Sequence, residues 1–94
     1  MPSITIKVDH PVGLHARPAA EFVKKASKFN SDIQVQNITS EGDPVNAKSI
    51  LSVLTLGVNQ GHEIKIDAEG TDASEALKSL SDLVDSNFGE ELKE

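Results

Sequence analysis

The sequence has no cysteine, tryptophan or tyrosine, and only three phenylalanines among its 94 residues. Without cysteine, neither a disulfide nor a thiolate metal site can form. The three histidines are scattered and lack the spacing with carboxylates that metal sites use, so we expect no metal ion and no cofactor. With so few aromatic side chains, the chain also has little on which nucleic-acid bases could stack.

Long apolar runs are missing as well. No stretch approaches the ~18 consecutive apolar residues of a membrane span. The first residues, MPSITIK, lack the basic and apolar segments of a signal peptide. We therefore expect a cytoplasmic protein that does not insert into a membrane. A chain of 94 residues has room for one core, which predicts a single domain over residues 1–94.

Acidic residues outnumber basic residues by 15 to 9, and the net charge of −6 is unevenly distributed. Residues 1–28 carry five basic and two acidic side chains, a net charge of +3, so the remainder carries −9. The acidic whole argues against nucleic acid as a partner. The basic first third suits either a bound anion or the docking of an acidic protein. The acidic run at residues 90–94 is expected to be a solvated end.

The periodicity of the apolar residues predicts seven elements in the order β-α-β-β-α-β-α. Strands are expected near residues 4–8, 33–36, 44–46 and 64–68, and helices near residues 16–30, 50–57 and 73–88. Placing three helices on one face of a four-stranded antiparallel sheet buries every apolar stripe. The predicted fold class is therefore α+β, an open-faced β-sandwich.

Local patterns predict how the helices and loops end. Asn30 can adopt the left-handed conformation that closes a helix, so it is expected to cap the first helix. Asp72 and Glu75 have the spacing of a capping box at the start of the last helix. His10 and His62 fall in expected loops, where we predict that both are exposed to solvent.

The candidate functional site lies in the segment Gly13-Leu14-His15-Ala16-Arg17-Pro18-Ala19. A helix is expected to begin directly after His15, because Pro18 is tolerated in a first turn and apolar residues then recur at helical spacing. The amides and positive dipole end of such a helix bind anions, phosphate above all. Arg17 adds a donor fork suited to phosphoryl oxygens, and Lys24 adds positive charge two turns further along.

A short helix is expected after Ser49, because serine is a good N-cap and Gly57 is a suitable terminator. Apolar side chains point nearly all round this helix, and a helix on one side of a sheet cannot bury them all. We therefore expect Leu51 and Leu54 to face solvent beside His15. An exposed apolar patch of this kind usually marks an interaction site.

Two segments together carry a family resemblance. GLHARPA, at residues 13–19, resembles the active-site signature of the HPr family, the histidine-containing phosphocarriers of the bacterial phosphoenolpyruvate:sugar phosphotransferase system. VNAKSILSVLTLG, at residues 45–57, resembles the regulatory-serine region of that family, and the likeness extends from about residue 4 to about residue 84. The resemblance implies the strand order 1-4-2-3 and a monomeric carrier that is not itself an enzyme.

The resemblance also implies roles for particular residues. Nδ1 of His15 is expected to accept a phosphoryl group from phosphorylated enzyme I and to donate it to the IIA domains of sugar permeases, with Arg17 stabilising the phosphate. Histidine suits such a shuttle because an unperturbed imidazole is largely neutral, and hence nucleophilic, near neutral pH. The docking surface for these partners is expected to comprise Ala16, Pro18, Ala20, Lys24, Leu51 and Leu54.

Ser49 has two interpretations. Capping alone explains a serine at this position. In the Gram-positive branch of the family, however, the serine in the matching Lys-Ser-Ile context is phosphorylated by an ATP-dependent HPr kinase/phosphorylase. The resemblance thus implies a regulatory phosphoserine at Ser49 and a catabolite control protein as a further partner. A phosphate there would be tolerated at a helix N-terminus and would add negative charge beside the apolar patch.

Three alternatives stay open at this point. A nitrogen-branch phosphocarrier shares the expected fold and the histidine. An acylphosphatase-like hydrolase would need a placed water and an assisting asparagine or acid near Arg17, which the sequence does not reveal. A pure interaction module would use only the patch of Leu51 and Leu54, and His15→Ala would then leave its function intact. Val12 stands where many HPr proteins carry a small polar residue, which leaves the conformation of the loop before His15 open.

Overall fold

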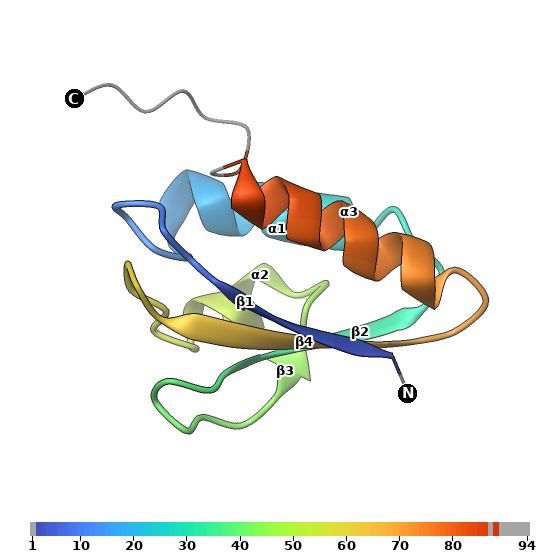
Figure 1. Cartoon of the computed structure of the whole chain (residues 1–94), viewed down its shortest axis with the longest axis horizontal. Helices are drawn as coiled ribbons and strands as arrows, with labels where there is room; N and C mark the ends of the chain where they lie inside the picture. The colour runs from blue at the N-terminus through green and yellow to red at the C-terminus, as the bar shows by residue number, and fades with distance from the viewer. Residues whose placement is uncertain (1, 87, 89–94) are drawn as a thin grey trace.

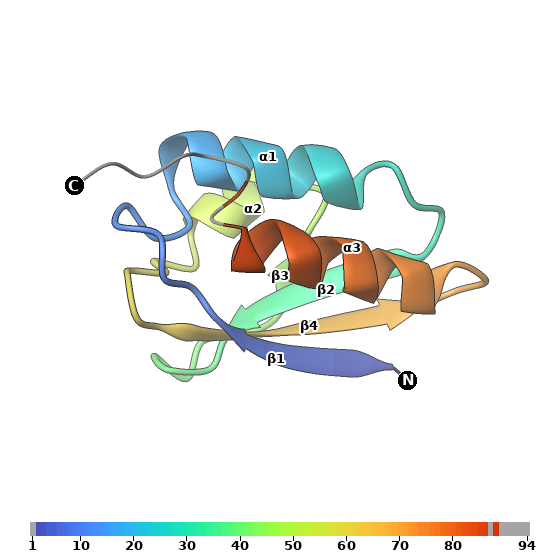
Figure 2. The same cartoon turned by 45° about the horizontal axis from the view of Figure 1, so that its top comes forward.

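The structure is a computed structural model that describes residues 2–86 and residue 88, so the acidic run at 90–94 lies outside it. Four strands pair antiparallel in the order β1-β4-β2-β3. Helices α1 and α3 lie side by side over one face of this sheet, which leaves the other face uncovered (Figures 1 and 2). The α+β fold class and the 1-4-2-3 order are confirmed. The elements are β1 (Ser3–Lys7), α1 (Ala16–Ala26), β2 (Asp32–Asn37), β3 (Val45–Asn46), α2 (Ile50–Leu54), β4 (Glu63–Glu69) and α3 (Ala73–Asp85).

The strand register brings the apolar side chains onto the face under the helices. Ile66 of β4 lies opposite Ile4 of β1 and Val35 of β2, and Ile66 is fully buried. Phe22 of α1 and Leu80 of α3 are also fully buried in this core. Each such side chain contributes about 1.5–3 kcal/mol on burial. This packing holds α1 in a fixed position over the sheet, and with it the segment that precedes the helix.

The turn between α1 and β2 differs from the prediction. Helix α1 ends before Asn30, whose N–H donates to Asp72 Oδ2 at 2.8 Å. Asp72 occupies the N-cap of α3, but its side chain makes no capping bond there; it accepts the N–H of Ser31 at 2.9 Å and the Ser31 hydroxyl instead. The predicted capping box with Glu75 and the predicted cap at Asn30 are both wrong, because the Asp72 carboxylate binds the neighbouring turn.

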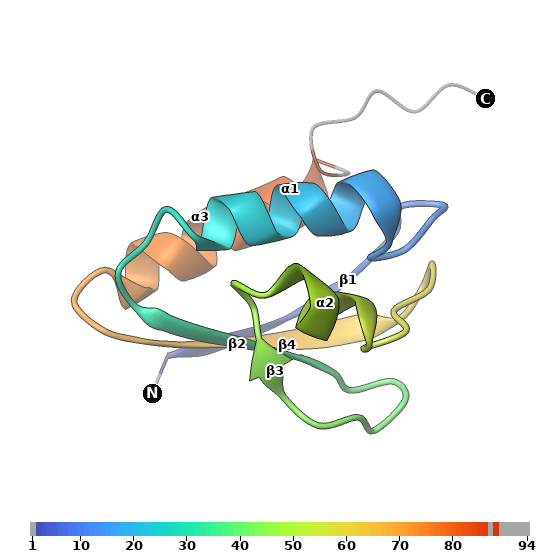
Figure 3. The same ribbon diagram turned by 180° about the vertical axis from the view of Figure 1, so that it is seen from behind.

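Helix α2 follows the prediction closely. Ser49 is its N-cap, and the Ser49 hydroxyl accepts the N–H of Ser52 at 3.3 Å. Val53 is buried, whereas other apolar side chains of this short helix reach solvent. Figure 3 shows α2 next to the N-terminal half of α1, so the exposed side chains of α2 lie at the same end of the molecule as His15.

None of the helices in the described part of the chain is long and apolar enough to cross a membrane.

Candidate functional site

His15 is the N-cap of α1, as the sequence predicts. Its backbone is extended, with φ −131° and ψ 169°, and its carbonyl accepts the N–H of Ala19 at 3.4 Å. The imidazole is half-buried, and it makes no hydrogen bond to any residue within 2–86 or to residue 88. An N-cap side chain usually accepts a bond from the first turn of its own helix. The ring nitrogens of His15 are therefore available for a reaction.

The first turn of α1 has an unusual backbone. Ala16 has a φ of +49°, the left-handed conformation that costs about 1–2 kcal/mol for a residue with a Cβ. Backbone strain of this kind is concentrated at functional sites. Pro18 has no N–H, and the N–H of Ala19 donates to the carbonyl of His15, so neither of these two residues offers an amide to an anion.

The residues just before His15 are fastened to the segment after α2. Leu14 is fully buried and donates its N–H to the carbonyl of Val58 at 3.0 Å. Gly13 has a φ of +73°, and a Cβ at this position would lie 2.2 Å from the same carbonyl oxygen. Only glycine fits both the conformation and the space. The backbone that leads into His15 is therefore held in one place.

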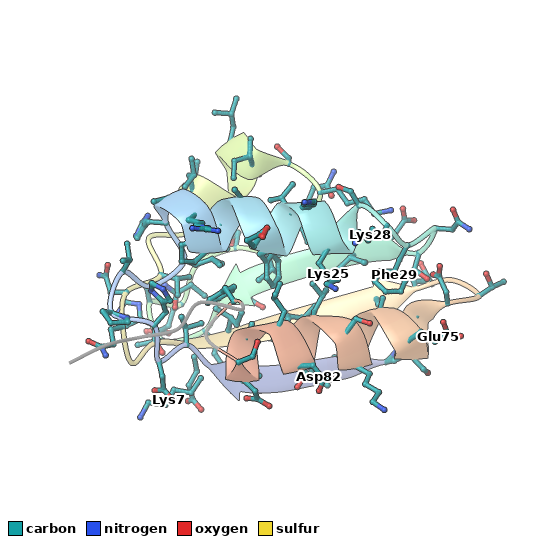
Figure 4. The ribbon with its side chains drawn as sticks, turned by 90° about the horizontal axis from the view of Figure 1, so that it is seen from above. Lys7, Lys25, Lys28, Phe29, Glu75 and Asp82 are labelled. Atoms are coloured by element: carbon teal, nitrogen blue, oxygen red, sulfur yellow. The ribbon has the colours of Figure 1, made fainter. Side chains whose placement is uncertain are left out.

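The positive charge near the site comes mainly from one side chain. Arg17 is exposed in the first turn of α1, two residues after His15. Lys24 is also exposed, but at a rise of 1.5 Å per residue it lies about 10 Å further along the helix axis. Figure 4 shows Lys25 near the C-terminal end of α1, extending toward α3, and Lys28 just beyond the helix. Arg17 is thus the basic side chain nearest to His15 in sequence, while the lysines lie further along the chain.

Apolar side chains are exposed on α2 and on the loop before His15. Leu51 is 75% exposed and Leu54 is 38% exposed, which confirms the predicted exposure of both. Ile50, at 38%, and Val12, at 47%, are exposed as well, and the sequence prediction did not include them. A signal for Ile50 was present, since apolar residues surround this helix on nearly every side.

One predicted docking residue is misplaced. Pro18 is fully buried on the face of α1 that it shares with Phe22, so its side chain cannot contact a partner. Pro18 instead lies in the first turn of the helix and packs in the core. Ala16, Ala20 and Lys24 are exposed, and their roles in docking stay predictions.

The two histidines predicted to be exposed are both at least partly buried, and each accepts a backbone hydrogen bond. His10 is only 2% exposed; its ring packs edge-on against Phe88, and its Nδ1 accepts the N–H of Val12 at 3.1 Å. His62 is half-buried, and its Nδ1 accepts the N–H of Asn59 at 3.1 Å. The prediction for these two residues is wrong because a neutral imidazole can accept bonds from loop amides and so pack against the loop.

Asn37 is a buried polar residue that the sequence analysis missed. Its side chain donates to the carbonyl of Leu56 at 3.2 Å and accepts the N–H of Ser40 at 3.2 Å. The same amide group lies 3.2 Å from Nδ1 of His62. A signal existed, since Asn37 continues the buried alternation of β2 that includes Val35. These bonds tie the end of α2 to the sheet and support the segment that binds Leu14.

In the described part of the chain, no cluster of three or more histidine, aspartate or glutamate side chains could hold a metal ion.

Comparisons with known proteins agree with this geometry. A family model described as "PTS HPr component phosphorylation site" matches residues 2–86. The chain belongs to this family. The HPr phosphocarriers of the phosphotransferase system are its members, so the resemblance predicted from the two sequence segments is confirmed.

The similar proteins differ in how much of their own length matches this chain. The phosphocarrier protein HPr of Buchnera aphidicola is 49% identical over 76 residues, which are 81% of this chain and 86% of that protein. A multiphosphoryl transfer protein of Haemophilus influenzae is 44% identical over 94% of this chain but only 17% of its own length. The chain thus spans about a fifth of the multiphosphoryl transfer proteins that it matches. The crystal structure of HPr-C-His from Thermoanaerobacter tengcongensis superposes with a TM-score of 0.91 at 52% identity, covering 98% of this chain and 100% of that one.

Proposed function

We propose that this chain is a phosphocarrier that accepts a phosphoryl group on His15 from phosphorylated enzyme I and passes it to the IIA domains of sugar permeases. The observation that carries the proposal is the half-buried imidazole at the N-cap of α1, which has no hydrogen bond within the described chain and adjoins the anion-binding end of the helix. Relatives named phosphocarrier protein HPr and multiphosphoryl transfer protein support it.

The proposed transfer is a substitution at phosphorus. A lone pair on Nδ1 of His15 forms a new P–N bond while the bond from phosphorus to the donor breaks, and its electron pair stays with the donor. The positive end of α1 and the guanidinium of Arg17 counter the charge on the phosphoryl oxygens. In the second transfer the electron pair of the P–N bond returns to His15 as the group moves to the IIA acceptor.

Docking in this proposal uses the surface around His15. The exposed side chains of Leu51 and Leu54 supply an apolar centre, and Arg17 and Lys24 supply a positive edge. Such a surface suits a partner with an apolar patch and an acidic rim, because complementary charge speeds association and sets orientation. Ala16 and Ala20 would allow close approach between the two.

The test is incubation with enzyme I and labelled phosphoenolpyruvate. The wild-type chain should take up one acid-labile phosphoryl group, His15→Ala should take up none, and Ser49→Ala should behave like the wild type. Label that persists in His15→Ala would refute the assignment. Turnover of an acyl phosphate without enzyme I would identify a hydrolase instead. Comparing IIA acceptors of the sugar and nitrogen branches would assign the branch.

We also propose that Ser49 is a regulatory site for an ATP-dependent HPr kinase/phosphorylase and, once phosphorylated, a binding determinant for a catabolite control protein. A phosphate on the Ser49 hydroxyl would add about −1.5 to −2 charges beside Leu51 and so weaken docking of an acidic partner. The support is the placement of Ser49 at the edge of the apolar patch, as the N-cap of α2. Incubation with ATP and the kinase should give an acid-stable product that is absent in Ser49→Ala.

A further inference from the structure

The loop before His15 contains a buried histidine that the proposed transfer does not use. His10 is 2% exposed, and its ring centroid lies 5.9 Å from that of Phe88 at an interplanar angle of 72°. Phe88 follows α3 and is itself 3% exposed. The ring of His10 is thus held against the distant end of the chain, in the edge-to-face arrangement that aromatic rings favour.

His10 also binds the second and third residues after it in the loop, Val12 and Gly13. Its Nδ1 accepts the N–H of Val12 at 3.1 Å, and its backbone carbonyl accepts the N–H of Gly13 at 2.8 Å. A side-chain acceptor that binds the amide two residues later forms a local turn in the manner of aspartate and asparagine. The conformation of the loop at Val12 and Gly13 is therefore set by both the side chain and the backbone of His10.

From this turn the constraint runs directly to the reactive histidine. Gly13 packs against Val58 so closely that a Cβ has no room, and Leu14 donates its N–H to the same carbonyl. His15 is the next residue. Each of the residues between His10 and His15, apart from Pro11, thus makes a backbone hydrogen bond through its N–H, so a change in the turn at His10 is passed along the chain to the imidazole of His15.

We propose that His10 is a positioning residue for phosphoryl transfer at His15: its Nδ1 acceptor sets the loop that orients the reactive imidazole at the start of α1. The inference rests on the proposed function of His15. If His10 had only a structural role, the outcome would differ. A side chain that only fills the core would affect stability without altering the reaction rate of the folded protein.

Three variants separate these roles. His10→Leu fills the buried site with an apolar side chain but removes the Nδ1 acceptor. His10→Asn restores a side-chain oxygen that can accept the N–H of Val12, although it loses the ring. Leu77→Ala removes buried apolar volume from the N-terminal half of α3, eleven residues before Phe88, and serves as the control for lost stability. If His10→Leu does not fold, His10→Gln takes its place in the comparison. The side-chain amide of glutamine lies one bond further from the backbone than that of asparagine, so its oxygen is displaced from the position of Nδ1.

Phosphorylation is measured with two donors, at a temperature where each variant is folded. One donor is enzyme I with phosphoenolpyruvate, and the other is phosphoramidate, a small donor that needs no docking surface. His10→Leu should slow both reactions about ten- to hundredfold, the loss expected when a reacting group is misplaced by a fraction of an ångström to an ångström. His10→Asn should recover most of the rate, and Leu77→Ala should react like the wild type.

Hydrogen exchange gives a readout that does not depend on activity. The amide of Val12 should exchange slowly in the wild type and in His10→Asn, and at least tenfold faster in His10→Leu. Wild-type rates in His10→Leu, or no recovery in His10→Asn, would overturn the proposal. A loss confined to the enzyme I reaction would do the same, since it would assign the effect to docking. Absence of label in the wild type with enzyme I would instead remove the proposed function, and the exchange data would still report on the loop.

Discussion

The two ends of α1 are held in opposite ways. At the C-terminal end, side chains from other elements bind the turn: Lys48 Nζ donates to the carbonyl of Phe29 at 2.8 Å, and the carboxylate of Asp72 accepts the amides of Asn30 and Ser31. These bonds fix the turn that follows the helix, which itself ends at Ala26. This end of the helix is therefore built for stability.

At the N-terminal end, the helix is positioned by backbone bonds while its capping side chain stays unused. The imidazole of His15 bonds to no described residue, and Ala16 adopts a strained left-handed conformation. The start of the helix is held by the residues that precede it, because the N–H of Leu14 donates to the carbonyl of Val58. The fold thus fixes the backbone of the site firmly while the side chain of His15 keeps its hydrogen-bonding capacity unused within the described chain.

The largest effect is expected where the backbone fastens the N-terminal end. Gly13→Ala should destabilise the protein by about 3 kcal/mol, because the new Cβ would meet the carbonyl of Val58 at 2.2 Å and the residue is already at a φ of +73°. Gly57→Ala is the matched control: Gly57 has a φ of +63° but nothing within 4 Å of its Cβ position, so about 1 kcal/mol of backbone strain is expected. Denaturant unfolding measures both, and equal losses would show that the close contact does not matter.

The next largest effect belongs to the other end of α1. Asp72→Asn should lower the melting temperature by several degrees at neutral pH, because one amide oxygen cannot replace a carboxylate that accepts bonds from Asn30 and Ser31. Phosphorylation of His15 should be unchanged. Asp82→Asn, at an exposed position of α3, controls for the loss of a negative charge. Slower phosphorylation in Asp72→Asn would show that the two ends are coupled.

The contribution of Asp72 should also depend on pH in a definite direction. Its hydrogen bond from the Ser31 hydroxyl, followed by that from the Asn30 amide, lowers the pKa of the Asp72 carboxyl from its ordinary value of 3.8. A group whose pKa is lower in the folded state adds stability above its unfolded pKa and loses it as the pH falls through the folded value. The difference in melting temperature between the wild type and Asp72→Asn should therefore be constant near neutrality and shrink below pH 3.8.

A smaller effect is expected at the other bond of the same turn. Lys48→Met keeps the aliphatic length of the side chain but removes the donor to the carbonyl of Phe29, which should cost about 1 kcal/mol. Lys28→Met, an exposed lysine near the same end of α1, should stay within about 0.5 kcal/mol of the wild type. Urea midpoints measure both variants. A similar loss in the two would mean that net charge, rather than the bond to Phe29, is responsible.

The elements that position the site could be predicted because their signals are local. The alternation of Ile64, Ile66 and Ala68 shows which face of β4 is buried, and Pro18 with the apolar residues after it shows where α1 begins. The strand order is different, since a two-residue period identifies faces but not neighbours. It came from the resemblance to the HPr family.

Two of the errors occur where a side chain contacts a residue far away in sequence. Asp72 and Glu75 fit a capping box by spacing, yet the Asp72 carboxylate turns to Ser31 once the sheet brings the two loops together. His10 looks like a loop histidine until the end of α3 places Phe88 against it. No local pattern contains such contacts, so only the assembled fold reveals them.

The smallest effect on stability should come from His15, the residue on which the proposed function depends. His15→Ala should change the free energy of unfolding by less than about 0.5 kcal/mol, because the imidazole is half-exposed and has no hydrogen bond to a described residue. Ser49 occupies the same kind of position but does cap its helix, so Ser49→Ala should cost about 1 kcal/mol. If denaturant unfolding gave His15→Ala the same loss as Ser49→Ala, the imidazole would be a structural cap, and the N-terminal end of α1 would not be reserved for a ligand.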